Sequence, residues 1–148
     1  MSRILRFYGR SYSFEDLEGI GKQICKKFGV TYKGFQLNGR SQELVIEGAK
    51  NGEVLVRKVP FQELRNYSLV SRSGEKPYYE DEKLVFYRDE LEETALCYAR
   101  VNCGTLDKFN ISHKTGGLIV YVNFGSRSNK FDISLYDVDR YLMSTNKF

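Results

Sequence analysis

The sequence predicts an α+β protein built from two similar halves, and two observations support this fold class. One constant shift in residue number aligns apolar and polar positions across most of the 148-residue chain. Each half also alternates segments of period-two hydrophobicity, typical of strands, with segments of helical periodicity. Strand-like runs joined by short polar turns favour a mostly antiparallel sheet, with the helices on one side of it.

The repeat relates residues 1–74 to residues 75–148. Thr31 and Thr105 are separated by 105 − 31 = 74 positions, and the same shift aligns Leu17 with Leu91. ILRFY (4–8) resembles KLVFY (83–87) at a shift of 83 − 4 = 79, so GRSYS is interpreted as an insertion in the first half. We expect two β-α-β-β-β-α repeats in one compact, pseudo-twofold domain. The alternative is that two similar patterns arose independently.

Local signals justify each element of the first half in turn. ILRFY alternates as a strand, and Ser13 with Asp16 forms a capping box for a helix that ends at Gly29. The strands VTYKGFQL, ELVIEG and EVLVRKV follow, with Asn51-Gly52 as the turn between the last two. PFQELRNY then predicts a brief helix with proline in its first turn.

The second half repeats this order of elements. KLVFY precedes a helix from about Asp89 to Asn102, which closes near Gly104. The strands DKFNIS, GLIVYVNF and KFDISL follow, and Ser134 opens the last helix. HKTGG lies between the first two of these strands and is predicted to be a hairpin turn.

Composition predicts a globular, soluble and cytoplasmic protein. Hydrophobic residues make up 41% of the chain and aromatic residues 14%, which lies far from disordered compositions. The sequence has no run of about 18 apolar residues, so we expect no membrane association. The three cysteines lack CxxC spacing, which favours reduced thiols and predicts neither a metal site nor a cofactor.

No catalytic constellation is recognisable in the sequence. His113 is the only histidine, and it lies in the predicted HKTGG turn where the other half carries Gly39. An imidazole base needs a nucleophile and an orienting group beside it, and no local pattern supplies them. We therefore predict no catalytic residue and no enzyme, and keep a carboxylate-based hydrolase as a third hypothesis.

Charge and strand alternation predict a binding surface. Residues 1–74 carry a net charge of +6 and residues 75–148 a net charge of −2. Alternation places a group of cations and rings on the sheet face opposite the helices. An acidic group at the start of the second long helix is either a dock for a basic partner or a solvated face that suits the helix dipole. The predicted binding residues are Arg6, Tyr8, Tyr32, Tyr87, Lys108, Tyr121, Asp89, Glu90 and Glu93.

These observations favour a non-enzymatic intracellular binding protein, of the adaptor or inhibitor type that mobile elements encode. Its open aromatic sheet face is expected to engage a protein or a nucleoprotein of the nucleic-acid machinery. The main alternative is a module that binds DNA or RNA directly, because cations interleaved with flat rings suit phosphates and bases.

Overall fold

The computed structural model describes residues 4–146, and these residues form two compact units. One unit comprises the described residues up to Glu75 together with Asn146, and the other comprises Lys76–Thr145. The boundary lies next to the predicted boundary between residues 74 and 75. The pseudo-twofold relation and the single compact domain stay predictions.

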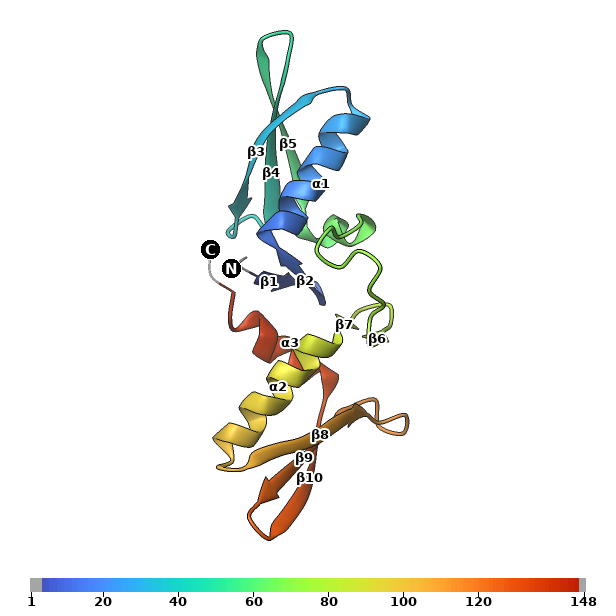
Figure 1. The fold of residues 1–148 in the computed structure, drawn as a ribbon. Helices are drawn as coiled ribbons and strands as arrows, with labels where there is room; N and C mark the ends of the chain where they lie inside the picture. The colour runs from blue at the N-terminus through green and yellow to red at the C-terminus, as the bar shows by residue number, and fades with distance from the viewer. Residues whose placement is uncertain (1–3, 147–148) are drawn as a thin grey trace. The chain divides into compact units, whose positions relative to one another are not determined.

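The first unit contains a hairpin, a helix, a three-stranded antiparallel sheet and a short 3-10 helix (Figure 1). In the sheet, β4 lies between β3 and β5. The helix packs on one face of this sheet around a core that includes Leu17, Ile20, Leu44 and Ile46. In chain order the elements are β1 (Ile4–Phe7), β2 (Arg10–Ser13), α1 (Phe14–Lys27), β3 (Thr31–Asn38), β4 (Glu43–Lys50), β5 (Glu53–Pro60) and η1 (Phe61–Asn66).

The second unit has the same order of elements. Its central strand is β9, and its core includes Leu91, Ala95, Val120 and Val138. The elements are β6 (Tyr79–Glu80), β7 (Val85–Phe86), α2 (Arg88–Val101), β8 (Thr105–Ile111), β9 (Leu118–Phe124), β10 (Arg127–Ile133) and α3 (Leu135–Met143). Both units are therefore α+β with antiparallel sheets, which confirms the predicted fold class. No helix among the described residues is long and apolar enough to cross a membrane.

The start and stop signals of the first long helix and the turn signal of the β4–β5 hairpin are confirmed, whereas Pro60 precedes η1 and Cys103, not Gly104, has the left-handed conformation after α2. The Ser13 side chain accepts a hydrogen bond from the Asp16 N–H, and the Asp16 carboxylate accepts one from the Ser13 N–H. A cap of this kind stabilises a helix by about 1 kcal/mol. Gly29 follows α1 with a φ of 64°, the left-handed conformation that glycine adopts at low cost. Asn51 and Gly52 both have positive φ, as a two-residue hairpin turn requires.

The interpretation of GRSYS as an insertion is wrong. Residues 10–13 form β2, which pairs antiparallel with β1, and β6 pairs with β7 in the same way before the second long helix. Each unit thus has the order β-β-α-β-β-β followed by a short helix, which is a 3-10 helix in the first unit and an α-helix in the second. α1 begins at Phe14 and α2 at Arg88, a separation of 88 − 14 = 74, so KLVFY corresponds to GRSYS without a gap. The alternation of polar and aromatic residues in GRSYS concealed this correspondence with the more apolar KLVFY.

Fine details of the backbone coincide at the same shift of 74. Asn38 Oδ1 accepts hydrogen bonds from the N–H groups of Arg40 and Ser41. Ser112 Oγ accepts them from Lys114 and Thr115 in the second unit. The first two sheet strands of each unit also share a register shift, between Tyr32 and Gly34 in one and between Leu106 and Lys108 in the other. These coincidences support a duplication, although common origin itself stays an inference.

The same packing contact occurs within each unit, but its two residue types are exchanged. A Cβ atom on Gly48 would overlap Val30 Cγ1, and a Cβ atom on Gly104 would overlap Val122 Cγ1. Gly104 corresponds to Val30, because 104 − 30 = 74, and Val122 corresponds to Gly48 in the same way. Each unit therefore places one valine against one glycine at this point, with the two residue types on opposite partners. Only one of the two positions has room for a side chain.

We predict that Gly48→Val destabilises the first unit by about 1–3 kcal/mol, because the added side chain would overlap Val30 in a contact that has no spare room. A backbone oxygen, that of Thr31, also lies 3.1 Å from the position of the new Cβ atom. The free energy of unfolding from urea denaturation measures the change.

The control is the exchange seen in the second unit. Val30→Gly combined with Gly48→Val restores one valine against one glycine, and should cost less than the sum of the two single substitutions. Strict additivity of the two changes would contradict the proposed equivalence of the packing contact.

Candidate binding face of the second unit

The sheet face of the second unit that lies opposite its helices carries four of the residues that alternation places there. Lys108 lies opposite Tyr121, and Asn110 lies opposite Ile119. The intervening residues Phe109 and Val120 pack into the helix-covered core. On β10, Lys130 lies opposite Tyr121 on the open face. Strand alternation therefore holds for β8 after its bulge and for β9.

This face is hollowed by a concavity of about 840 Å³. Ile119, Tyr121 and Lys130 line it from the three-stranded sheet. Tyr78, just before β6, and Tyr79, the first residue of β6, line it from a segment that precedes β8 and β9 in the sequence. His113 and Gly116 add the turn between β8 and β9. Rings, an apolar side chain and a lysine thus surround one open depression.

Charged groups of both signs surround the concavity. Two lysines lie on or beside it, and Asp81 accepts a hydrogen bond of 2.7 Å from the hydroxyl of its lining residue Tyr79. Lys108 Nζ lies 4.8 Å from the centre of the Tyr121 ring, a distance at which the cation and the ring attract each other. Lys130 lines the concavity, and no carboxylate is among its described lining residues. Asp132 lies on the same face, where it accepts a hydrogen bond of 2.9 Å from the Thr115 hydroxyl. This contact ties one acidic group to the turn beside the depression.

The predicted positions of Arg6 and Tyr87 on an open face are wrong. Arg6 is 1% exposed, and its guanidinium donates hydrogen bonds to Gly9 O at 2.9 Å and to Ser11 Oγ at 3.1 Å. Tyr87 is 6% exposed and precedes α2, where its N–H donates to Glu90 Oε1. Both residues belong to the hairpins that precede the long helices, and these hairpins are not part of the three-stranded sheets.

The positions of Tyr8 and Tyr32 differ from prediction for other reasons. Tyr8 is exposed, but it lies in the turn between β1 and β2 with a φ of 51°, and its hydroxyl donates to Gln42. Tyr32 packs against the core of the first unit, close to Gly21 of α1. The bulge after Tyr32 adds one residue and reverses the alternation, so that Tyr32 and Phe35 share the helix-covered face. The open face of the first sheet consequently carries no tyrosine among the described residues.

The acidic group at the start of α2 divides into two parts. Glu90 is buried and accepts the Tyr87 N–H, so it serves as a helix cap. Asp89 and Glu93 are exposed and border a depression of about 370 Å³ with Arg100 and Tyr141. The pKa of Tyr141 is raised to about 12, mainly by a hydrogen bond with Cys97 and to a smaller extent by burial. Asp89 and Glu93 thus lie on the helix side of this unit, whereas Asp132 lies on the open face of its sheet.

The raised pKa of Tyr141 predicts a loss of stability in strong alkali. The neutral phenol is favoured in the folded chain, so its contribution is complete below the ordinary tyrosine pKa of 10 and is lost as the pH rises towards 12. Tyr141→Phe should therefore narrow the difference in unfolding free energy between pH 9 and pH 12. Chemical denaturation at each pH measures it, and an unchanged pH dependence would contradict the assignment.

His113 is exposed in the turn between β8 and β9, as predicted for HKTGG. It lies at the edge of the concavity. Among residues 4–146 there is no cluster of three or more histidine, cysteine or carboxylate side chains arranged to hold a metal ion.

His113→Ala should change the free energy of unfolding by less than about 0.5 kcal/mol, because an exposed turn residue contributes little packing. Thermal denaturation provides the comparison, and a large loss would contradict the turn assignment.

Sequence reasoning missed Tyr78, Tyr79 and Lys130 at this face. Alternation along KFDISL contains the signal for Lys130, because it places Lys130 and Asp132 on the face opposite Phe131. Tyr78 and Tyr79 precede any regular pattern, and only the fold brings them beside β8 and β9. No protein family model, no curated protein and no solved structure matches this chain.

Proposed function

We propose that this chain is a non-enzymatic binding protein that engages a nucleoprotein partner. On this proposal, a nucleic acid strand of the partner lies on the open sheet face of the second unit. The observation that carries the proposal is the concavity lined by Tyr78, Tyr79, Tyr121 and Lys130, with Lys108 beside the Tyr121 ring.

The chemistry of this face suits an extended single strand. Aromatic rings offer stacking surfaces to bases of any sequence, and lysines neutralise the phosphates between them. Tyr78 is exposed, and Tyr79 and Tyr121 are half-buried. The Asn110 side chain and the Tyr78 and Tyr121 hydroxyls can exchange hydrogen bonds with base edges or sugars, whereas the Tyr79 hydroxyl donates to Asp81. A concavity of about 840 Å³ is also large enough for more than one nucleotide.

The distribution of charge supports nucleic acid at this face despite the net negative charge of the second half. The exposed carboxylates Asp89, Glu92 and Glu93 belong to α2, on the helix side of the sheet. The open face presents Lys108 and Lys130, and its carboxylates Asp132 and Asp81 are hydrogen-bonded to the Thr115 and Tyr79 hydroxyls. The two lysines are therefore the groups that a phosphate backbone would contact, and the acidic start of α2 is left for a protein component.

The second candidate is a purely protein partner. It is favoured by the acidic border of the depression at Asp89, Glu92 and Glu93, which would attract a basic surface. Rings and apolar side chains in the concavity would then act as anchors for a protein.

We predict that Tyr121→Ala weakens binding of a fluorescein-labelled single-stranded oligonucleotide by about tenfold, because one stacked base is lost. Fluorescence anisotropy of DNA and RNA oligonucleotides at low salt measures the dissociation constant. Lys130→Ala should lower the slope of log affinity against log salt by about 0.7, the loss of one phosphate contact.

Tyr8→Ala is the matched control, because it removes an exposed tyrosine from the first unit and should leave oligonucleotide affinity unchanged. Absence of binding to any single strand at low salt would overturn the nucleic-acid role of the face. Retention of a host partner after nuclease treatment, with loss of that partner in Tyr121→Ala, would then favour the protein alternative.

A further inference from the structure

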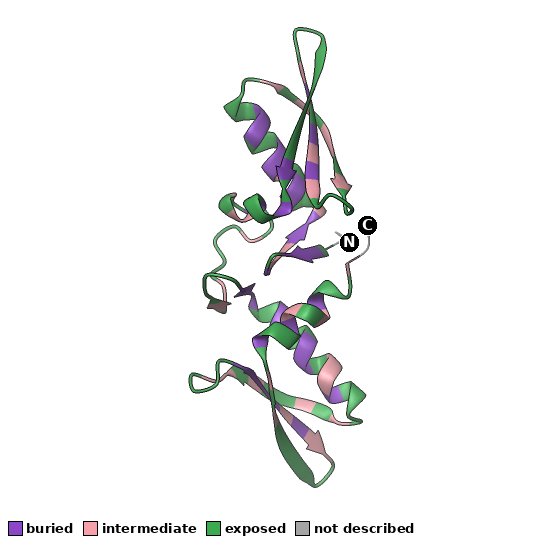
Figure 2. Ribbon diagram, turned by 180° about the vertical axis from the view of Figure 1, so that it is seen from behind, coloured by how far each residue is buried: buried purple, intermediate pink, exposed green. Residues whose placement is uncertain are grey.

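β5 is the end strand of the first sheet, and it exposes three consecutive apolar side chains. Val54, Leu55 and Val56 are 71%, 41% and 57% exposed. The strand is exposed along nearly its whole length (Figure 2). An exposed end strand presents unpaired backbone donors and acceptors to other chains, and proteins usually protect such edges with charged or polar residues.

The corresponding strand of the second unit has that protection. At the shift of 74, Ser128, Asn129 and Lys130 of β10 stand where β5 carries Val54, Leu55 and Val56. Both strands end their sheets, and both belong to the same order of elements. The apolar edge is therefore not a requirement of the fold, since the same architecture exists with a polar edge.

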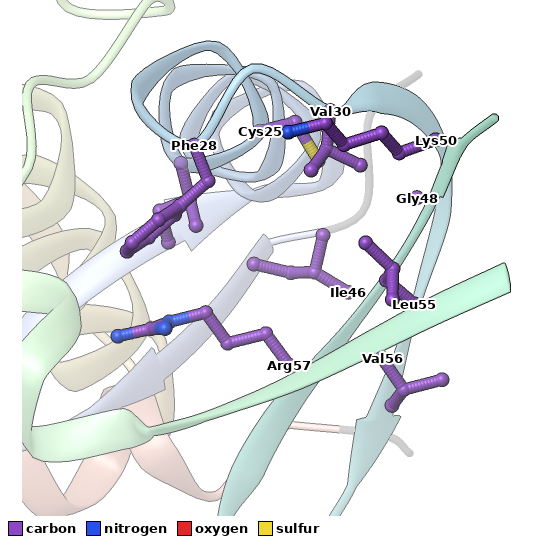
Figure 3. Close-up of a pocket in the computed structure, with 10 residues that line it drawn as sticks. Cys25, Phe28, Val30, Ile46, Gly48, Lys50, Leu55, Val56 and Arg57 are labelled. Atoms are coloured by element: carbon purple, nitrogen blue, oxygen red, sulfur yellow. The ribbon is translucent and has the colours of Figure 1, made fainter. Parts of the chain in front are cut away.

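A groove beside β5 shows the same contrast between the units. It measures about 280 Å³ and lies between the end of α1 and the β4–β5 hairpin, lined by Ile24, Phe28, Ile46, Leu55 and Arg57 (Figure 3). The Arg57 guanidinium lies 4.5 Å from the centre of the Phe28 ring.

In the second unit, aromatic rings occupy the corresponding positions. Tyr98, Phe124 and Phe131 stand where the first unit has Ile24, Lys50 and Arg57. The ring centres of Tyr98 and Phe131 are 5.3 Å apart, and those of Phe124 and Phe131 are 6.4 Å apart. In the first unit, therefore, the groove beside β5 is open and the end strand exposes apolar side chains. In the second unit, rings fill the corresponding space and the end strand is polar.

We propose that β5 pairs antiparallel with β5 of a second copy of this chain, which joins two three-stranded sheets into one of six strands. The sequence of β5 is complementary to itself in one register. In that register Glu53 lies opposite Arg57 of the other copy, Val54 lies opposite Val56, and Leu55 lies opposite Leu55. A shift of two residues in either direction sets Glu53 opposite Val59 or Leu55, so charge complementarity selects the stated register.

The faces of the strand agree with this arrangement. Residues directly opposite in an antiparallel pair lie on the same face of the sheet. Leu55 and Arg57 are on the helix-covered face, because they pair with Gly48 and Ile46, whereas Val56 points to the other side (Figure 3). The two Leu55 side chains would extend the apolar wall of the groove, and two Val54–Val56 pairs would cover the opposite face. The inference does not rest on the proposed nucleic-acid function.

Charge reversal tests both the dimer and its register. Sedimentation velocity over a concentration series should show a monomer–dimer equilibrium for the full chain. Glu53→Arg and Arg57→Glu each place two like-charged pairs in the dimer, and each should weaken dimerisation by about tenfold or more. An equimolar mixture of the two variants restores two opposite-charged pairs, so native mass spectrometry should detect the mixed dimer in preference to either homodimer.

Lys58→Glu is the matched control, since it reverses a charge on β5 outside the three residue pairs and should leave the dimer largely intact. Circular dichroism melts of each variant separate a loss of pairing from a loss of folding. A mixed dimer formed by two variants that are monomeric on their own would show that neither substitution abolishes the fold of β5. A chain that stays monomeric throughout the series, or a dimer unaffected by either reversal, would overturn the proposal. Pairing with a strand of another protein would be indicated if only a foreign partner protected the β5 amides from hydrogen exchange.

Discussion

Each unit has one long helix to cover one face of a three-stranded sheet, and the exposed surfaces of the chain depend on this constraint. The helix buries the core around Leu44 and Ile46 in the first unit, and around Val120 and Val122 in the second. The opposite sheet face receives no helix from its own unit. An antiparallel sheet tolerates such a wet face because its alternating side chains present polar groups there. Function is then decided by the side chains that this open face and the sheet edges carry.

A single extra residue in β3 and in β8 determines which side chains those are. The bulge reverses the alternation, so that Tyr32 and Phe35 lie on one face although three positions separate them. In the second unit the same bulge keeps Leu106 and Phe109 together in the core and leaves Lys108 on the open face. The Lys108 ammonium then lies over the ring of Tyr121, which belongs to the neighbouring strand. Because both units have this bulge, the difference between their open faces lies in the residue types: Gly34 and Glu47 stand where the second unit has Lys108 and Tyr121.

The two units preserve backbone features more faithfully than surfaces. Turns at Asn38 and Ser112, both bulges and both long helices coincide at one shift, because these features maintain hydrogen bonding and core packing. The outer strands have diverged instead. β5 exposes Val54, Leu55 and Val56 beside an open groove, whereas the corresponding residues of β10 are polar and rings fill the space beside them. Exposed positions can diverge in this way without loss of the fold, because they contribute little to core packing.

The sequence by itself determined the α+β class, the order of the long helices and sheet strands, and most of their ends. Those features depend on local signals: the Ser13–Asp16 capping box, the positive φ of Gly29 and Asn51-Gly52, and hydrophobic periodicity. Lys108 and Tyr121 could be assigned to the open face from the sequence. Side chains alternate regularly between the open face and the core along β9, and along β8 from Lys108 onwards. Only the tertiary structure decided the burial of Arg6, Tyr87 and Glu90, which depends on hairpins and caps rather than on period. It alone brought Tyr78 and Tyr79 beside β9 and showed that β5 lies uncovered at the edge of its sheet. The physical reason is that burial and proximity arise from contacts between distant segments, whereas periodicity reports only how one segment faces its nearest layer.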